Sequence, residues 1–212
     1  MKVLVTGTSS GIGQAIAIKF LEEGHDVIGF DKCDATIENL NYKHYIQDIT
    51  EDLPNIDDVN IIVNNAGVQD GDVIDVNLKG TINVTEKYIN PSIKSIVFIA
   101  SSSATTGSEF PNYVASKGGV VAYMKNVALR LAEYGATANS ISPGGVITPL
   151  NAHILNSKDL YKKVLDETLL NKWATAEEIA DFTYFISVIN KSMTGEDIFI
   201  DNGEKLKSNF IW

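Results

Sequence analysis

The sequence predicts an α/β fold in which helices cover both faces of a doubly wound parallel sheet. Short runs rich in Val and Ile alternate with amphipathic stretches along the whole chain, which is typical of repeated β-α units. A glycine-rich turn directly follows the first apolar run, as in nucleotide-binding units of this kind. We therefore expect a three-layer, Rossmann-like α/β/α arrangement. No linker, repeat or low-complexity segment interrupts it, so residues 1–212 are expected to form a single domain.

The first half of the chain contains four short runs, most of them rich in Val and Ile, that suit strands of a buried sheet. These runs are Lys2–Val5, Asp26–Phe30, His44–Gln47 and Asn60–Asn64. Apolar residues recur at helical spacing in two longer stretches. These stretches are Gly13–Glu23 and Asp75–Tyr88.

The second half continues the alternation with three strands and three helices. The strands are expected at Ser95–Ala100, Thr137–Ser142 and Asp197–Ile200. The helices are expected at Tyr113–Glu133, Ser157–Leu170 and Ala176–Ile189. Between Pro143 and Asn156 two prolines and two adjacent glycines exclude a long regular element, so we expect a flexible flap before a short helix. Trp173 and Trp212 are expected to pack against the core.

Composition excludes several classes of protein. The chain has 212 residues and a formal net charge of −10, without a cluster of Lys or Arg, so a nucleic-acid partner is not expected. No apolar run approaches the roughly 20 residues of a membrane span, so no membrane partner is expected. The single cysteine, Cys33, and the absence of a secretory leader predict a cytoplasmic protein. The three histidines show no metal-ligand spacing, so no metal is expected.

The turn after the first strand reads TGTSSGIG, from Thr6 to Gly13, and a helix follows it. Glycines allow a sharp turn and close approach of the backbone to a pyrophosphate, and the free N–H groups of a helix N-terminus attract anions. Asp31 closes the second strand, where a carboxylate accepts hydrogen bonds from ribose hydroxyls and repels a 2′-phosphate. The pattern predicts a dinucleotide site that favours NAD over NADP. Binding of NADP remains an alternative, because Lys32 could bind its phosphate. Asp31 could also be a solvated loop residue without a role in binding.

Tyr113 and Lys117 lie four residues apart at the start of a predicted helix, so their side chains share a face. A free tyrosine has a pKa near 10, and acid/base work near pH 7 requires lowering it by about three units. A neighbouring ammonium and the positive nicotinamide of an oxidised cofactor could together supply this shift. The pair alone is weak evidence, since tyrosine and lysine often share a helix surface.

Further motifs accompany this pair in a fixed order over nearly the whole chain. They are TGTSSGIG at Thr6–Gly13, NNAG at Asn64–Gly67, Asn77, Ser101, YVASK at Tyr113–Lys117 and PGG at Pro143–Gly145. This set resembles the classical short-chain dehydrogenase/reductase family. The resemblance implies an NAD(P)(H)-dependent oxidoreductase that interconverts a secondary alcohol and a ketone by hydride transfer, with a small carbonyl or alcohol molecule as substrate.

The resemblance also implies a role for each matched residue. Tyr113 would be the acid/base, and Lys117 would hold the nicotinamide ribose. Ser101 would orient the substrate oxygen, and Asn77 would hold a water that links Lys117 to solvent. The residues implied to contact the cofactor are Gly7, Ser9, Ser10, Gly11, Ile12, Gly13, Asp31, Asp48, Ile49, Asn65, Ala66, Gly67, Tyr113, Lys117, Pro143, Gly144, Val146 and Thr148.

Some assignments remain open at this point. Ser101, Ser102 and Ser103 are consecutive, so Ser102 could be the reactive serine, or Ser101 could only cap a turn. Asn77 could instead be an amide in a helix interior that binds a backbone carbonyl. A catalytically silent dinucleotide-binding sensor or structural protein with the same fold is the alternative function, and a nucleotide-sugar epimerase or dehydratase fits the glycine spacing poorly.

The chain is about forty residues shorter than typical members of the family. Two connections look shortened, from Asp48 to Asn64 and from Gly67 to Asn77. The first leaves room only for a short turn. The second removes the front of a helix that commonly forms subunit contacts in relatives. A dimer or tetramer like those of relatives therefore cannot be assumed, and a homo-oligomer of either kind would need an altered interface.

Overall fold

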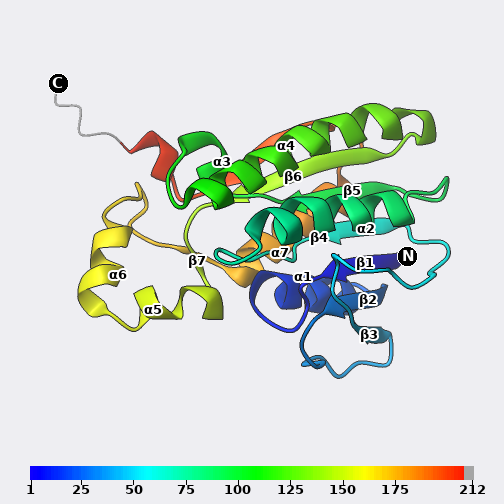
Figure 1. The fold of residues 1–212 in the computed structure, drawn as a ribbon, viewed down its shortest axis with the longest axis horizontal. Helices are drawn as coiled ribbons and strands as arrows, with labels where there is room; N and C mark the ends of the chain where they lie inside the picture. Colours follow the sequence, from blue (N-terminus) through cyan, green and yellow to red (C-terminus); the bar gives the residue numbers. More distant parts are fainter. Residues whose placement is uncertain (208–212) are drawn as a thin grey trace.

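The computed structural model of the protein describes residues 1–207, and a seven-stranded sheet in the order β3-β2-β1-β4-β5-β6-β9 forms its centre (Figure 1). All neighbouring strands in this sheet are parallel. The strands are β1 (Lys2–Thr6), β2 (Asp26–Asp31), β3 (Tyr42–Ile46), β4 (Ile61–Asn64), β5 (Ser95–Ile99), β6 (Thr137–Pro143) and β9 (Asp197–Ile200). All seven predicted strands are present, with ends shifted by no more than two residues.

Seven α-helices connect these strands. They are α1 (Gly11–Glu22), α2 (Thr81–Tyr88), α3 (Ser103–Thr106), α4 (Pro111–Leu131), α5 (Ala152–Leu155), α6 (Lys158–Leu165) and α7 (Ala176–Tyr184). Short 3₁₀ turns occupy Ala132–Tyr134, Pro149–Asn151 and Glu204–Leu206. Helix α4 begins two residues before the predicted start because Pro111, with its fixed φ and missing N–H, suits the first helical position.

Alternate residues of the strands enter two separate cores, which confirms the three-layer, doubly wound fold. Val3 and Val5 of β1 pack with α1 and α7 on one face of the sheet. Leu4, between them, packs with α2 and α4 on the other face. Figure 1 shows these two pairs of helices enclosing the sheet. Burial on both faces explains the nearly continuous apolar strands.

Two predicted helices contain a π-helical turn. The expected helix Asp75–Tyr88 begins with a π-helical turn, Asp75–Gly80, and continues as α2. The expected helix Ala176–Ile189 consists of α7 and a π-helical end, Phe185–Ile189. Such turns hold an extra residue and reorient the side chains around it. The first of them carries Asn77.

The prediction of a helix at Ser157–Leu170 was too long. Helix α6 ends at Leu165, where the Thr168 hydroxyl donates a hydrogen bond to the Leu165 carbonyl and accepts one from the Lys172 N–H. Asn171 adopts a left-handed conformation with φ of 49°. The side chain of Thr168 thus competes with the helix for backbone groups and turns the chain.

The segment after β6 contains no long regular element, as predicted. It includes a strand that the sequence did not predict, β7 (Val146–Ile147), which pairs in parallel with β8 (Ala174–Thr175). Trp173, which precedes β8, is buried as expected, whereas Trp212 lies outside the described residues. Figure 1 shows α5 and α6 as a lobe beside the main sheet, connected to it through β7.

The edge strand β3 is connected to its neighbours without helices. Residues 47–60, between β3 and β4, contain no helix, which confirms the expected short connection. Residues 32–41, between β2 and β3, also contain neither helix nor strand. Parallel strands usually need a crossover of about a dozen residues or more. At this edge, contacts made by side chains therefore have to hold the connecting segments against the sheet, as packed helices do elsewhere in the fold.

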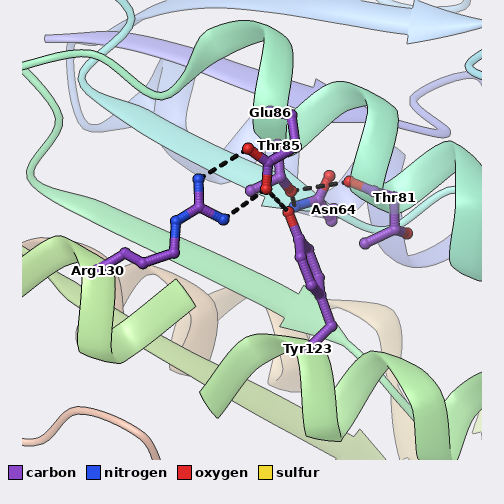
Figure 2. A network of polar contacts seen from close by, with 6 residues as sticks. All are labelled: Asn64, Thr81, Thr85, Glu86, Tyr123 and Arg130. Carbon is purple, nitrogen blue, oxygen red and sulfur yellow. Dashed lines mark hydrogen bonds and ion pairs between the residues drawn. The ribbon is translucent and has the colours of Figure 1, made fainter. Parts of the chain in front are cut away.

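Polar contacts tie α2 and α4 to each other and to β4 (Figure 2). The Glu86 carboxylate of α2 accepts hydrogen bonds from both terminal nitrogens of Arg130, at 2.6 and 2.7 Å, and from the Tyr123 hydroxyl at 2.6 Å. The side-chain amide of Asn64, at the end of β4, donates to the Thr85 hydroxyl at 2.9 Å. These contacts help to set the position of α4, the helix that carries Tyr113 and Lys117.

Two features are absent from the described part of the chain. Within residues 1–207, no helix combines the length and the hydropathy needed to span a bilayer. The same residues contain no group of three or more His, Cys, Asp or Glu side chains arranged to hold a metal ion.

Candidate active site

A cleft of about 420 Å³ lies at the carboxyl ends of the central strands. It is bounded by the turns after β1, β2, β4, β5 and β6, by the start of α4 and by the flap after β6. Sixteen of the eighteen residues implied to contact the cofactor line it. They are Gly7, Ser10, Gly11, Ile12, Asp31, Asp48, Ile49, Asn65, Ala66, Gly67, Tyr113, Lys117, Pro143, Gly144, Val146 and Thr148. Residues from across the whole sequence thus share one cavity.

The glycine-rich turn has the backbone that its sequence suggests. Gly7 and Gly11 both have positive φ, of 76° and 58°. A side chain on Gly13 would collide with the Gly7 carbonyl, so Gly13 lies beneath the turn rather than in the cleft. Helix α1 begins at Gly11, and its N-cap Ser10 makes no side-chain hydrogen bond to the helix. The first N–H groups of α1 therefore remain available to an anion.

Neighbouring elements hold this turn in place. The Asn65 side-chain amide donates to the carbonyls of Thr6 and Gly7, at 2.9 and 3.3 Å. The Thr6 hydroxyl accepts from the backbone N–H groups of Asn65 and Ala66. On the opposite side, Gly11 faces Thr148: a Cβ atom added to Gly11 would lie 3.5 Å from the Thr148 side chain. The flap after β6 thus reaches across the cleft to the glycine-rich turn.

Asp31 and its neighbours form the end of the cleft beside β2. The Asp31 carboxylate accepts hydrogen bonds from the backbone N–H groups of Ser9 and Cys33, at 2.9 and 3.0 Å. Ser9, which does not line the cleft, therefore acts on its shape through Asp31. Lys32 forms an ion pair with Asp48 at 2.9 Å. The pKa of Asp48 is lowered to about 2, chiefly by the Thr50 N–H and then by Lys32. The charge of Lys32 is thus offset by a neighbour.

Tyr113 and Lys117 project into the cleft from the first turns of α4. The Lys117 ammonium donates a hydrogen bond to the carbonyl of Ile99 at 2.9 Å and lies 5.7 Å from the centre of the Tyr113 ring. Burial lowers the pKa of Lys117 to about 8, while the negative charge of Glu109 opposes this shift. The ammonium is thus held at the end of β5, nearly out of contact with water.

Burial raises the pKa of Tyr113 to about 12, and the negative charge of Glu109 adds to the increase, whereas a hydrogen bond with Ser101 opposes it. This direction is opposite to the one that acid/base work near pH 7 requires. The ammonium of Lys117 by itself does not lower the pKa of the phenol in this structure, because burial disfavours the phenolate more strongly. Glu109 was missed by the sequence analysis; its positive φ of 85° is rare for a residue other than glycine and is visible only in the structure.

Ser101 and Asn77 lie next to the cleft without lining it. The hydroxyl of Ser101 lowers the pKa of Tyr113. It also accepts hydrogen bonds from the backbone N–H and the hydroxyl of Ser103. Ser102 is buried, and its N–H donates to the Pro143 carbonyl.

The Asn77 side chain accepts from the N–H of Val68 at 2.7 Å and donates to its carbonyl at 2.9 Å. This is the kind of backbone contact that the alternative interpretation of Asn77 describes. Asn77 and Lys117 nevertheless approach each other at Gly67. A side-chain carbon on that glycine would lie 3.1 Å from the Asn77 oxygen and 3.4 Å from the Lys117 nitrogen. Gly67 therefore keeps the space between the two side chains clear.

Lys32, which the sequence analysis considered as a phosphate-binding position, also lines the cleft. The sequence analysis did not predict the other residues of the cleft wall, which are Phe30, Cys33, Gln47, Val68, Gln69, Val76, Ile99, Ala100, Pro149 and Leu150. Most of these residues are next to a predicted residue in the sequence. They could have been predicted by including the whole strand end or turn around each motif residue.

Known proteins resemble the chain over nearly its full length. A family model described as Enoyl-(Acyl carrier protein) reductase matches residues 31–205. A protein of Buchnera aphidicola named 3-oxoacyl-(acyl-carrier-protein) reductase FabG is 31% identical, over 94% of this chain and 95% of the relative. A protein of Thermotoga maritima with the same name is 30% identical, over 94% of this chain and 96% of the relative.

Solved structures resemble the fold equally closely. A 4-hydroxyisoleucine dehydrogenase mutant complexed with NADH and succinate has a TM-score of 0.87 and 26% identity, over 99% of this chain and 100% of that chain. A short chain dehydrogenase family protein from Francisella tularensis has a TM-score of 0.85 and 28% identity, over 97% of this chain and 99% of that chain.

Proposed function

The chain belongs to the short-chain dehydrogenase/reductase family, and we propose that it interconverts a secondary alcohol and a ketone with Tyr113 as the acid/base. Within this family it is an oxidoreductase that acts on CH–OH groups with a nicotinamide dinucleotide. One observation carries the proposal. Tyr113 and Lys117 line the same cleft as the glycine-rich turn and the N-terminus of α1.

The residues of the cleft fit a dinucleotide. The free N–H groups at the start of α1 and the open backbone at Gly7 and Gly11 suit a pyrophosphate. Asp31 presents a carboxylate to the end of the cleft beside β2, where it would accept the hydroxyls of a ribose. We assign NAD rather than NADP as the cofactor. Two features support this: Asp31 would repel a 2′-phosphate, and the cation of Lys32 is offset by Asp48.

The nicotinamide ring, when bound, supplies or accepts the hydride and in its oxidised form contributes a positive charge. In the reductive direction Tyr113 gives its phenolic proton to the carbonyl oxygen of the substrate. A raised pKa keeps this phenol protonated at neutral pH, so the proton is present when a ketone binds. In the oxidative direction the same oxygen must lose its proton before it can accept one from the alcohol.

The neighbours of Tyr113 hold and move this proton in the proposed mechanism. Ser101 lowers the pKa of the phenol and would orient the substrate oxygen toward it. Lys117 would hold the nicotinamide ribose and, with a pKa of about 8, can exchange a proton close to neutral pH. Asn77 would hold a water in the space beside Gly67 that links Lys117 to solvent.

A 3-oxoacyl group carried on an acyl carrier protein is a second candidate substrate. The relatives from Buchnera aphidicola and Thermotoga maritima are named reductases of that substrate. Leu150, which lines the cleft and is 56% exposed, would suit an acyl chain. The net charge of −10 weighs against docking an acidic carrier protein. We therefore keep the broader class, a secondary alcohol or ketone, as the proposal.

Subunit assembly through α2 and α4 accompanies this proposal. The π-helical turn and α2 together form a short helix, and Leu129 on α4 is 79% exposed. A dimer or tetramer that uses this pair of helices would cover Leu129. Light scattering of the purified protein measures the assembly directly, and a monomeric mass would contradict it.

The Tyr113→Phe variant tests the proposed function. A panel of ketones and secondary alcohols is screened with NADH, NADPH, NAD and NADP by the absorbance of the reduced nicotinamide. We expect Tyr113→Phe to lower kcat by at least about 10²-fold, the usual contribution of an acid/base group. Its affinity for NADH, measured by fluorescence, should remain close to that of the parent. A fully active Tyr113→Phe protein would refute the mechanism, and a parent that binds NADH but turns over no substrate would favour the silent sensor.

A further inference from the structure

Two side chains of the edge strand β3 reach across β2 to the glycine-rich turn. Tyr42 and His44 project from the same face of β3, on which their partners in β2 are Val27 and Gly29. A side chain on Gly29 would collide with the hydroxyl of Tyr42 and with that of Thr8. Gly29 therefore leaves the space in which a tyrosine from the edge strand can contact the turn after β1. No motif of the family accounts for this arrangement.

A continuous chain of hydrogen bonds runs through this space. The Tyr42 hydroxyl oxygen lies 2.8 Å from the Thr8 hydroxyl oxygen and 2.9 Å from Nδ1 of His44. Nε2 of His44 lies 2.9 Å from the Cys33 carbonyl oxygen. A carbonyl only accepts, so Nε2 carries the proton of this bond. Thr8 is fully buried, and Tyr42 is partly removed from water.

The other end of this chain is the wall of the cofactor cleft. Asp31, Lys32 and Cys33 line the cleft directly after β2. The Cys33 carbonyl accepts hydrogen bonds from Nε2 of His44 at 2.9 Å and from the Ser9 hydroxyl at 3.4 Å. The Cys33 N–H in turn donates to Asp31. His44 thus contacts the backbone of the turn that determines where the Asp31 carboxylate lies.

We propose that Tyr42 and His44 are positioning residues for the adenosine half of the dinucleotide. Because no helix packs behind residues 32–41, these two side chains hold the Asp31–Cys33 turn at a set distance from the glycine-rich turn. Neither side chain lines the cleft, so each acts through Thr8 or Cys33. The inference rests on the proposed use of this cleft for NAD and adds to it two residues that the family motifs do not include.

Two amide variants of His44 separate the two contacts of its ring. Gln places a side-chain N–H near the position of Nε2, so His44→Gln keeps the bond to Cys33. Asn places its amide near Nδ1, so His44→Asn keeps only the contact with Tyr42. Both variants introduce the same chemical group on the same strand. His44→Ala removes both contacts, and Lys43→Ala, an exposed residue on the other face of β3, is the matched control.

The experiment measures the dissociation constant of NADH by fluorescence, the KM and kcat of turnover, and the melting temperature. We expect His44→Ala and His44→Asn to weaken NADH binding about 5- to 10-fold, as the loss of one hydrogen bond does. His44→Gln and Lys43→Ala should remain within twofold of the parent. The change should appear in the KM for NADH, with kcat within twofold, because the reacting groups lie at the other end of the cleft.

The reverse order, in which His44→Asn binds NADH like the parent and His44→Gln does not, would overturn the inference. Equal affinity of all the variants would also overturn it. If His44→Ala does not fold, the comparison of the two amide variants still decides the question. If the parent itself binds no NADH, the proposed function fails, and alkylation of Cys33 then tests the inference separately. Cys33 is the single cysteine, so faster alkylation of His44→Asn than of His44→Gln would support the contact, and equal rates would refute it.

Discussion

The ammonium of Lys117 donates a hydrogen bond to the carbonyl of Ile99, the last residue of β5, at 2.9 Å. This bond fixes the side chain of a helix to the end of the neighbouring strand. The buried ammonium therefore lies beside the ring of Tyr113. Its partner, Ile99, comes two residues before Ser101 in the chain. The catalytic groups proposed here are therefore positioned by the packing of α4 on the sheet and not by α4 alone.

Lys117 should make the stability of the protein depend on pH. Its pKa of about 8 in the folded protein lies below the ordinary value of 10.5, so protonation opposes folding. The cost is complete below about pH 8 and is lost as the pH rises toward 10.5. We expect the stability of Lys117→Met relative to the parent to fall by about 2 kcal/mol between pH 7 and pH 9.5. Urea unfolding at both pH values measures this, and a difference independent of pH would contradict it.

Glu109 should control the pH dependence of alcohol oxidation, because its negative charge raises the pKa of Tyr113. Oxidation needs the phenolate, so the rate rises with pH until Tyr113 is deprotonated. We expect Glu109→Gln to shift this rise to lower pH and to increase the oxidation rate at pH 7 by a few-fold. The pH profile of kcat checks this. Glu177→Gln, on the surface of α7, is the control, and an unshifted Glu109→Gln profile would remove Glu109 from the site.

The choice between Ser101 and Ser102 as the reactive serine can be made by substitution. Ser101 lowers the pKa of Tyr113, whereas the backbone N–H of Ser102 donates to the Pro143 carbonyl. We expect Ser101→Ala to lower kcat by about 10²-fold, as the loss of a group that orients a developing oxyanion does. Ser102→Ala should stay within about threefold of the parent. Loss of activity in Ser102→Ala alone would show that the proposed assignment is displaced by one residue.

Asp31 should set the preference for NAD over NADP and also hold the turn around it. Asp31→Ser removes a charge that repels a 2′-phosphate, so we expect the ratio of kcat/KM for NADPH to that for NADH to rise by about tenfold or more. The same change removes acceptors for the N–H groups of Ser9 and Cys33, so NADH binding should weaken. Asp31→Asn removes the charge and keeps one oxygen. It should relax the preference with a smaller loss of NADH affinity, and an unchanged ratio in both variants would exclude Asp31 from selection.

Much of the fold followed from local patterns in the chain. Apolar runs located the central strands β1, β4 and β5, because a parallel strand buried on both faces needs apolar residues throughout. The glycines of the first turn located the nucleotide cradle, because their positive φ and close approaches tolerate few other residues. The spacing of Tyr113 and Lys117 on one helix predicted that both side chains would reach the same cleft.

The tertiary structure decided what depends on neighbours distant in the sequence. The pKa of Tyr113 reflects burial and the charge of Glu109, whose backbone conformation no motif indicates. The length of α6 depends on a threonine that competes for its last carbonyl. The role of His44 depends on a glycine in another strand that leaves room for Tyr42. Local periodicity records which face of an element is buried, whereas electrostatics and hydrogen bonds depend on which atoms meet after the chain has folded.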